Sequence, residues 1–438
     1  MTIFKTSLLI DLLSESKDGE WGEASYLPDY RLMGVIRGAD FESCRLGNME
    51  NLPRRFIPTR ISERKELRTN DIVIETAGGT ADRPTGRTLL IKDSLINQSE
   101  IPLICASFSR FLRPDESKVY APYLYWYLQY LYHSGQMDVH QIQHTGVARF
   151  QYTDFSKSTL IPIPSIQIQT RIAEILSSLD DTIELNRRMN ETLEQMAMAL
   201  YKHWFIDFGP FPDGEFIDSE LGLIPKEWEV VNIGSAVQIL GGGTPSTKIK
   251  EYWEYGTINW FSPTDLTAAR SLFIEKSSKK ITKFGLDNSS ARLFPPQSIM
   301  MTSRATIGEI AINRSEACTN QGFITLIPNE SFSLYQIYGW LRFNRDAILS
   351  IANGSTFLEV SKSNFKSLKI TKPYGIEKYL NISHNIFAQI DSLISENKLL
   401  IETRDYLLPR LLSGEINLDI VEDHVQEVMS DVNTPVRV

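Results

Sequence analysis

Few side chains in this chain have the identity and spacing that catalysis requires. The glycine-rich segment 241–247 is not followed by the Lys-Ser or Lys-Thr pair of a phosphate-binding loop, so it predicts a turn in which the backbone approaches another group closely. His140 and His144 lie four residues apart, but no glutamate or third ligand completes a zinc-binding pattern. We therefore expect no metal site, and we interpret both histidines as ordinary surface or core residues.

Three further patterns match pieces of enzymes without completing them. The Pro-Asp pair at 28–29 and the Glu-Arg-Lys triplet at 63–65 have the residue types of a nuclease site, but the interval is long and such triplets are common by chance. The Asp-Phe-Gly tripeptide at 207–209 matches a kinase motif, but the catalytic-loop motif of kinases does not accompany it. The Gly-x-Ser-x-Gly motif that carries the nucleophilic serine of hydrolases is also absent from the sequence. The Asn/Asp-Pro-Pro-aromatic tetrapeptide of amino-methyltransferases is also missing. We expect no catalytic residue and no bound cofactor, so the pattern indicates a binding protein.

Polar side chains beside glycines suggest what is bound. Arginine pairs with guanine through two parallel hydrogen bonds, asparagine and glutamine pair with adenine, and serine and threonine hydroxyls reach phosphates. Loops on a rigid sheet can carry such side chains and differ between copies of one framework. The candidate DNA-contacting residues in loops are Arg83 and Arg87 in the first half of the chain, and Thr244, Ser246, Arg304, Thr306, Asn320 and Gln321 in the second half. Ordinary turn chemistry is the competing interpretation for each of them.

A heptad pattern runs through the middle of the chain, from Gln167 to Phe208. From Ile172 onward, apolar residues recur at two seam positions, charged and amide residues fill most other positions up to Arg188, and neither proline nor glycine interrupts the run. Such a pattern is typical of a coiled-coil helix, which at ~1.5 Å per residue spans roughly 60 Å. An ordinary core helix is the alternative. A coiled-coil helix needs a partner, because it cannot bury its seam alone.

The partner lies at the other end of the chain, because the sequence repeats itself. Trp126 and Trp340 stand in matching aromatic segments, and a second long helix, Tyr379–Leu412, follows the second copy as the first helix follows the first copy. Aligning the two helices places Asn186 on Asn397 at the same heptad position. We predict an antiparallel pair in which these two asparagines lie near one another and fix the register. Two independent helices, each packed on its own domain, are the alternative.

The repeat defines the expected organisation. The predicted segments are a first globular domain (1–165), a central spacer helix (166–206), a linker (207–224), a second globular domain (225–373), a C-terminal spacer helix (374–414) and an acidic tail (415–438). Short strands, turn signals and one aromatic helix in each copy predict mixed domains with mostly antiparallel sheets. The fold class is therefore α+β, with two similar α/β domains joined by two long antiparallel coiled-coil helices in an internal pseudo-two-fold repeat.

Composition narrows the class further. A hydrophobic content of 42% and a charged content of 23% are typical of a soluble globular protein, and no apolar run approaches the ~20 residues of a membrane helix. Three widely spaced cysteines without a Cys-x-x-Cys pair favour the reducing cytoplasm. The net charge of −9 argues against nucleic acid, but basic residues outnumber acidic ones in segments 31–68 and 270–283. We include Arg37, from the first of these segments, among the candidate DNA-contacting residues.

Several motifs resemble one known family. The second copy carries Pro225-Lys-Glu-Trp228, Gly242-Gly-Thr-Pro-Ser246, Ile258-Asn-Trp260, Thr302–Gly308, Asn320-Gln321-Gly-Phe323 and Gly354-Ser-Thr356, and the segments 204–208 and 411–416 follow the two helices. These motifs resemble the target-recognition domain of type I restriction–modification specificity (S) subunits. The resemblance covers nearly the whole chain. The first copy departs from it, because it lacks the Gly-Gly-Thr-Pro motif and a clear Pro-x-x-Trp start.

The resemblance implies a non-catalytic subunit that binds double-stranded DNA in the cytoplasm. Each target-recognition domain would read one half of a bipartite target, and Trp260 would belong with the DNA-contacting residues. The paired helices would set the spacing between half-sites, ~34 Å for one helical turn, and would dock two methyltransferase (modification) subunits that use S-adenosylmethionine. ATP-driven restriction subunits would complete the assembly, and partner subunits would supply much of the phosphate neutralisation.

Two other hypotheses are carried forward. One is a fused nuclease or methyltransferase relative with its own catalysis, against which the missing tetrapeptide and nucleotide-binding loop argue. The other is a two-domain coiled-coil adaptor that never touches DNA. Methylation or cleavage by the chain alone would favour the first, and failure to bind DNA with or without partners would favour the second.

Overall fold

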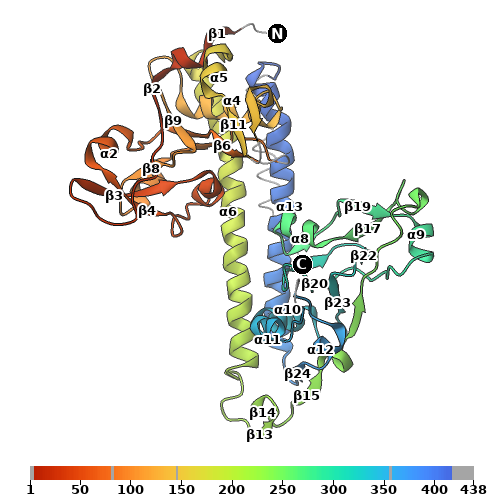
Figure 1. Ribbon diagram of the computed structural model, residues 1–438. Coiled ribbons are helices and arrows are strands. Elements are labelled where there is room, and N and C mark those ends of the chain that lie inside the picture. Colours follow the sequence, from red (N-terminus) through yellow and green to blue (C-terminus); the bar gives the residue numbers. More distant parts are fainter. Residues whose placement is uncertain (1–3, 80–82, 145–146, 355–357, 417–438) are drawn as a thin grey trace. The chain divides into compact units, whose positions relative to one another are not determined.

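The computed structural model describes residues 4–79, 83–144, 147–354 and 358–416. The chain divides into two compact units, one of Met1–Leu185 with Glu396–Val438 and the other of Asn186–Ser395. Two long helices, α6 (Ile166–Phe205) and α13 (Glu377–Leu412), each contribute one segment to each unit (Figure 1). The two long helices predicted from the heptads are therefore confirmed.

In its described residues, the first unit contains three small sheets and one strand pair. Its four-stranded antiparallel sheet has the order β2 (Leu13–Asp18), β9 (Ser109–Pro114), β5 (Ile72–Glu75), β7 (Thr88–Leu90). A three-stranded sheet has the order β4 (Arg54–Pro58), β3 (Tyr30–Ile36), β8 (Leu103–Cys105), with β3 parallel to β8. The remaining strands are β10 (Gln141–His144), β11 (Val147–Phe150) and β6 (Ala77–Gly79) in one sheet, and β1 (Lys5–Leu8) paired with β12 (Leu160–Ile163).

Alternation along β5 explains how this unit holds two cores. Ile72 and Ile74 face the core that includes the long helices, while Val73 faces a smaller core on the other side. All three residues are fully buried, so this strand is apolar on both faces. The short helices of the unit are α1 (Phe41–Arg45), α2 (Thr59–Lys65), α3 (Asp93–Gln98), α4 (Ala121–His133) and α5 (Tyr152–Ser158).

Within the first unit, the two helix segments run antiparallel. Leu179 and Ile183 of α6 share a core with Leu400 and Leu407 of α13. Arg404 of α13 donates to the Asp180 carboxylate at 2.8 Å, while Asn397, earlier in α13, donates to the Ile183 carbonyl, later in α6, at 3.2 Å. Residue numbers therefore rise along one helix as they fall along the other, as the heptad seams predict.

The second unit repeats this plan. Its main sheet has the order β16 (Gln238–Gly241), β23 (Phe323–Ile327), β20 (Ile299–Thr302), β21 (Ile310–Asn313), β18 (Phe273–Ile274). Its small sheet has the order β19 (Lys279–Ile281), β17 (Ile258–Phe261), β22 (Ala317–Thr319), with β17 parallel to β22. Strand β15 (Glu229–Asn232) pairs with β24 (Lys369–Lys372), and β13 (Phe216–Ser219) forms a hairpin with β14 (Gly222–Pro225).

Its helix α10 packs closely on the long helices. The Tyr338 hydroxyl of α10 (Leu334–Phe343) donates to Glu194 of α6 at 3.0 Å, and a Cβ added at Gly339 would lie 2.3 Å from the Tyr201 ring. Phe205 of α6 meets Tyr379 of α13 with ring centroids 4.9 Å apart. The other short helices are α7 (Ile233–Ala236), α8 (Pro263–Ala269), α9 (Lys283–Asp287), α11 (Arg345–Ser350) and α12 (Lys362–Lys366).

The internal repeat is therefore a repeat of topology. The order β2-β9-β5-β7 in the first unit matches β16-β23-β20-β21 in the second, and β4-β3-β8 matches β19-β17-β22. In both small sheets only the second pair is parallel. The expectation of mostly antiparallel sheets is confirmed. The parallel pair in each small sheet follows from the crossover that leads from β3 to β8 and from β17 to β22, and the main sheet of the second unit holds a further parallel pair, β18 with β21.

Asn186 and Asn397 are both buried, with exposed fractions of 4% and 8%. A buried amide on a helix seam needs hydrogen-bond partners, and the Asn397 amide finds one in the Ile183 carbonyl of the same unit. In the described part of the chain, no helix combines the length and apolar character that a membrane crossing needs.

Candidate nucleic-acid interface

In the second unit, three loops follow the carboxyl ends of β16, β22 and β20 and contact one another. The Gly243 amide donates to the Thr319 carbonyl at 2.9 Å, and the Thr244 hydroxyl donates to the Gln321 side chain at 2.5 Å. A Cβ added at Gly242 would lie 1.9 Å from the Asn320 carbonyl oxygen. Glycine is required at this position because the two backbones touch, as the glycine-rich segment predicts.

Two tryptophans hold the glycine-rich loop in place. The Trp260 indole donates to the Gly243 carbonyl at 2.9 Å, and the Trp253 indole donates to the Ser246 carbonyl at 3.1 Å. The two rings meet edge to face with centroids 5.1 Å apart. Trp260 is only 6% exposed and lies beneath the loop, so in this structure its side chain positions the loop.

The third loop carries Arg304 and Thr306. The Ser303 amide donates to the Gly322 carbonyl at 2.8 Å, which joins this loop to the turn after β22. Arg304 pairs with Glu359 at 2.7 Å, and both side chains are nearly half exposed, at 46% and 41%. The structure therefore brings together the second-half candidates predicted from the sequence: Thr244, Ser246, Trp260, Arg304, Thr306, Asn320 and Gln321.

The first unit has a loop in the same place, although it lacks the Gly-Gly-Thr-Pro motif. Gly19 follows β2, and a Cβ there would lie 2.1 Å from the carbonyl oxygen of Cys105, the last residue of β8. The Glu20 amide donates to that same carbonyl at 2.8 Å, as the Gly243 amide does to Thr319. The segment 19–22 is thus the first unit's counterpart of the glycine-rich loop. Sequence motifs missed it, and the available signal was a lone glycine directly after an alternating strand.

The first-half candidates Arg37 and Arg87 are held by carboxylates. Arg37 donates to both Asp40 oxygens at 2.8 Å, and Arg87 donates to both Glu75 oxygens at 2.9 and 2.8 Å. Hydrogen bonding to Asp40 raises the pKa of Arg37, and hydrogen bonding to Glu75 raises the pKa of Arg87. Both arginines therefore stay charged and oriented. Arg83 is exposed and donates to the Gly78 carbonyl at 3.1 Å.

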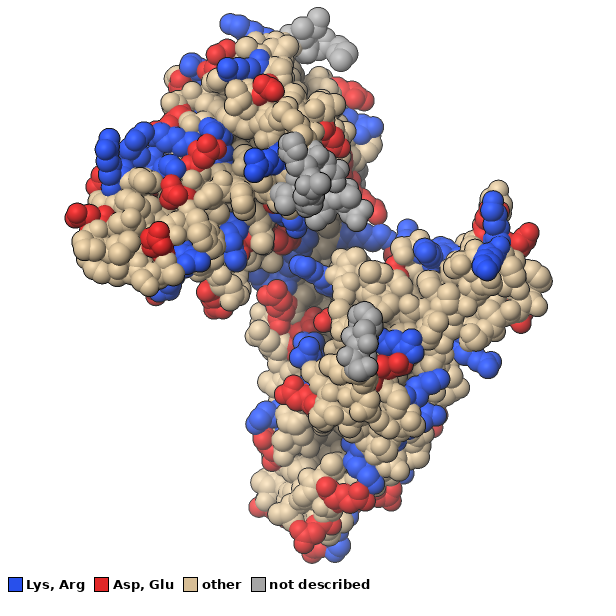
Figure 2. Space-filling view, viewed as in Figure 1, with Lys and Arg blue, Asp and Glu red and all other residues tan. Residues whose placement is uncertain are grey.

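Helix α2 adds exposed positive charge that no motif marked. Figure 2 shows Lys and Arg side chains gathered over α2. Arg60 and Arg64 of this helix are exposed, and neither has an ion pair with a residue in the described ranges. Exposed cations of this kind suit phosphate contacts, which position a protein on DNA without reading its sequence. In the second unit, the exposed lysines Lys248, Lys250, Lys279, Lys280 and Lys283 cluster around β19 and α9.

The other reactive groups in the described ranges do not suggest catalysis. Burial raises the pKa of the Cys44, Cys105 and Cys318 thiols to about 12, so none is an activated nucleophile. No group of three or more His, Cys, Asp and Glu side chains is arranged to hold a metal ion in the part of the chain that the structure describes.

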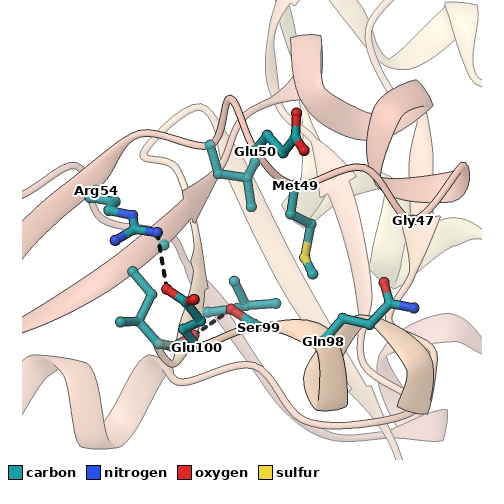
Figure 3. Close-up of a pocket in the computed structure, with 11 residues that line it drawn as sticks. Gly47, Met49, Glu50, Arg54, Gln98, Ser99 and Glu100 are labelled. Atoms are coloured by element: carbon teal, nitrogen blue, oxygen red, sulfur yellow. Dashed lines mark hydrogen bonds and ion pairs between the residues drawn. The ribbon is translucent and has the colours of Figure 1, made fainter.

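A pocket of about 290 Å³ opens beside β4 in the first unit (Figure 3). Met49 and Leu103 contribute apolar walls, and Arg54 and Glu100 form an ion pair of 3.3 Å among its lining residues. The positive charge of Arg54 is therefore already balanced within the pocket.

Comparisons with known proteins agree with this geometry. The family described as "Type I restriction modification DNA specificity domain" matches residues 62–195 and 225–403. The specificity subunit of the type I restriction enzyme MjaIX from Methanocaldococcus jannaschii is 36% identical over 187 residues, 42% of this chain and 42% of that protein. The specificity subunit of the type I restriction enzyme HindI from Haemophilus influenzae is 25% identical over 450 residues, 87% of this chain and 93% of that protein.

A solved structure is similar over nearly the full length. The crystal structure of a type I restriction–modification S subunit from M. genitalium superposes with a TM-score of 0.56 at 15% identity, covering 93% of this chain and 96% of that one. At this identity the likeness establishes a shared fold.

Proposed function

Because the chain belongs to the family of type I restriction–modification DNA specificity domains, we propose that it is the non-catalytic specificity subunit of such an enzyme. Each unit reads one half of a bipartite sequence in double-stranded DNA. The observation that carries this proposal is the repeated loop cluster, in which the loops after β2 and β8, and after β16 and β22, touch through the same backbone contacts.

The second half-site is read by side chains that are exposed or easily freed. The Arg304–Glu359 pair is nearly half exposed, so by the usual worth of surface pairs it contributes only ~0–1 kcal/mol, and a DNA group can displace Glu359. Arg304 and Gln321 are assigned to base edges, and Thr244, Ser246 and Thr306 to phosphates or base edges. In the first unit, Arg83 is assigned to DNA, while Arg37 and Arg87 contact DNA with the face that their carboxylate partners leave open.

Two methyltransferase subunits dock on the helices, one for each unit. Each unit exposes apolar side chains on its own helix segments: Leu185, Leu399 and Tyr406 in the first unit, and Met189, Met196 and Ile382 in the second. Contiguous apolar patches on a protein surface mark contacts with other proteins, and we assign these side chains to the docking surfaces. The methyltransferase subunits bring S-adenosylmethionine, and restriction subunits join them to cut unmethylated DNA. The complex works in the cytoplasm, where the three free cysteines stay reduced.

The test is methylation mapping with the complex of this chain and its modification subunits. With S-adenosylmethionine and random DNA, methylated adenines should fall in one bipartite motif that requires the chain. Arg304→Ala and Gln321→Ala should each relax bases in one half of that motif, with a loss of roughly 1–3 kcal/mol per bidentate contact. Lys226→Ala, directly after the β13–β14 hairpin and outside the loop cluster, is the matched control.

Three outcomes would contradict the proposal or its residue assignments. Methylation or cleavage by the chain alone would make it an enzyme. Failure to bind DNA with and without the modification subunits would make it an adaptor. Equal weakening on every sequence by Arg304→Ala and Gln321→Ala would assign both side chains to phosphates.

A further inference from the structure

An arginine lies over a tryptophan of the segment 19–22, the first unit's counterpart of the glycine-rich loop. The Arg55 guanidinium of β4 lies over the Trp21 ring, 4.5 Å from its centroid. Trp21 is 36% exposed and belongs to the segment 19–22 that touches β8. Neither residue was among the candidates predicted from the sequence.

The backbone around Trp21 is fixed on both sides. On the carboxyl side, Gly22 has φ +71°, and a Cβ there would lie 2.5 Å from the Phe56 carbonyl oxygen. Glu23 and Phe56 then exchange backbone hydrogen bonds of 2.8 and 3.0 Å. On the amino side, Lys65 donates to the Gly19 carbonyl at 3.2 Å. The backbone that carries the indole under the guanidinium is therefore fixed.

The stack leaves the hydrogen-bonding edge of Arg55 available. Within the described ranges, the Arg55 guanidinium makes no hydrogen bond and no ion pair. A guanidinium that stacks by its face keeps its N–H donors in the plane, where they match two acceptors side by side. Guanine presents such a pair, O6 and N7, in the major groove. The contact with Trp21 also restricts the Arg55 side chain before DNA binds, so less side-chain entropy is lost on binding.

The neighbouring arginine has a different environment. Arg54 precedes Arg55 in β4, so its side chain points to the opposite face of the sheet. There it pairs with Glu100 in the pocket of Figure 3. The chain thus offers two adjacent arginines, one neutralised and one with free donors, which makes Arg54 the matched control for Arg55.

The second unit has no counterpart of this arginine. The Ala106 amide donates to the Ile36 carbonyl in the first unit, and the Asn320 amide donates to the Phe261 carbonyl in the second, which aligns β3 with β17. Met33 of β3 and Ile258 of β17 each lie three residues before the accepting carbonyl and are therefore equivalent. Met33 pairs with Arg55 of β4, whereas Ile258 pairs with Ile281 of β19. Ile281 is fully buried. The arginine is therefore a feature of the first unit alone.

We propose that Arg55, oriented by Trp21, reads a guanine in the half-site of the first unit. Arg55 is the specificity-determining residue, and Trp21 is its positioning residue. The inference rests on the proposed function, because it requires that the first unit read DNA.

The experiment uses the complete complex with modification subunits and compares R55K, R55A, W21A, W21F and R54A. R55K keeps the charge and loses the planar fork, so methylation of the cognate site should fall about tenfold or more and one guanine in the first half-site should become degenerate. W21A should give the same degeneracy with a smaller fall, and W21F should restore the motif. R54A should leave the motif unchanged.

Several results would overturn the inference. A first half-site without guanine, or an R55K motif identical to the wild-type motif, would remove the base contact. R55A could instead weaken binding equally on all DNA sequences and lower the slope of log binding constant against log salt concentration by about one. That result would show that Arg55 contacts a phosphate. Gln321→Ala, which changes the other half-site, identifies which half belongs to which unit. If the wild-type complex reads no bipartite motif, the proposed function is wrong. If the wild-type complex reads a bipartite motif and R55K leaves that motif unchanged, only the inference about Arg55 is wrong.

Discussion

The two units share strand order and differ in how they secure the same loops. In the second unit, two indoles hold the glycine-rich loop through the Gly243 and Ser246 carbonyls. In the first unit, Lys65 holds the corresponding loop through the Gly19 carbonyl and the Glu20 carboxylate. The backbone contact to the strand below is the same in both units. Backbone hydrogen bonds thus define the framework, while side chains free of that task can differ and read different bases.

A second difference lies after β5 and β20. The Gly86 amide donates to the Glu75 carbonyl and the Gly308 amide to the Thr302 carbonyl, each at 3.0 Å, so the loops between these residues are counterparts. The first loop is longer, and an Arg87–Glu75 pair supports it. In the second loop the Thr302 hydroxyl serves that purpose, because it accepts the Glu309 amide at 3.0 Å. A longer loop is thus supported by a charged pair and a shorter one by a hydroxyl.

The largest expected effect comes from the loop glycines. Gly242→Ala places a Cβ against the Asn320 carbonyl oxygen, so the backbone must move. We expect this displacement to cost about 3 kcal/mol, which corresponds to about a hundredfold loss in methylation of DNA that carries the second half-site. Gly19→Ala should do the same through the first half-site. Gly241→Ala, whose Cβ meets only the mobile end of Lys362, is the control. Normal binding by both variants, measured with targets altered in one half, would show that neither loop depends on this contact, and a loss in only one variant would break the equivalence of the two loops.

Removing the charged support should destabilise one unit. Glu75→Ala leaves Arg87 largely buried without its carboxylate, at a cost of about 3 kcal/mol in the free energy of unfolding of the first unit. Thr302→Ala in the second unit should cost only about 1 kcal/mol, because neutral hydrogen bonds are lost. Residue-resolved hydrogen exchange measures the loss of stability in each of the two variants. Equal losses would show that the two supports are energetically the same.

Trp260→Phe should weaken reading of the second half-site about fivefold to tenfold. The ring still fills its site, but the Gly243 carbonyl loses its indole donor, at about 1 kcal/mol. Trp228→Phe removes a similar hydrogen bond, to the Tyr374 carbonyl, away from the loops. It should lower stability and leave the motif intact. Identical motif changes in the two variants would mean that Trp260 acts through stability alone.

The smallest effect concerns the helix asparagines. The heptad alignment predicts that Asn186 and Asn397 lie near one another, so the double variant Asn186→Cys with Asn397→Cys should cross-link on mild oxidation. The combination of Leu193→Cys with Asn397→Cys, displaced by one heptad, should not. Asn397→Leu alone should raise the free energy of unfolding by about 1 kcal/mol, since a buried amide secures register at the expense of stability. Efficient cross-linking of the displaced pair would contradict the predicted register.

Local pattern accounts for much of the fold. The heptads predicted α6 and α13, and the aromatic segment around Trp126 predicted α4. These elements bury regular apolar faces, and such regularity is visible within a short window. The loop at 19–22 was not visible in that way, because what identifies it as the counterpart of the glycine-rich loop is contact with Cys105, far along the chain.

The sequence by itself therefore determined the period of the helices, the repeat, and the residues of the second unit that gather around the glycine-rich loop. Only the tertiary structure decided that Trp260 lies under that loop, that Arg87 is bound by Glu75, and that Arg54 is paired with Glu100 while Arg55 lies over Trp21. The physical reason is that apolar periodicity is a local property. The partner of a charged side chain depends on which distant strands are brought within about 3 Å of it.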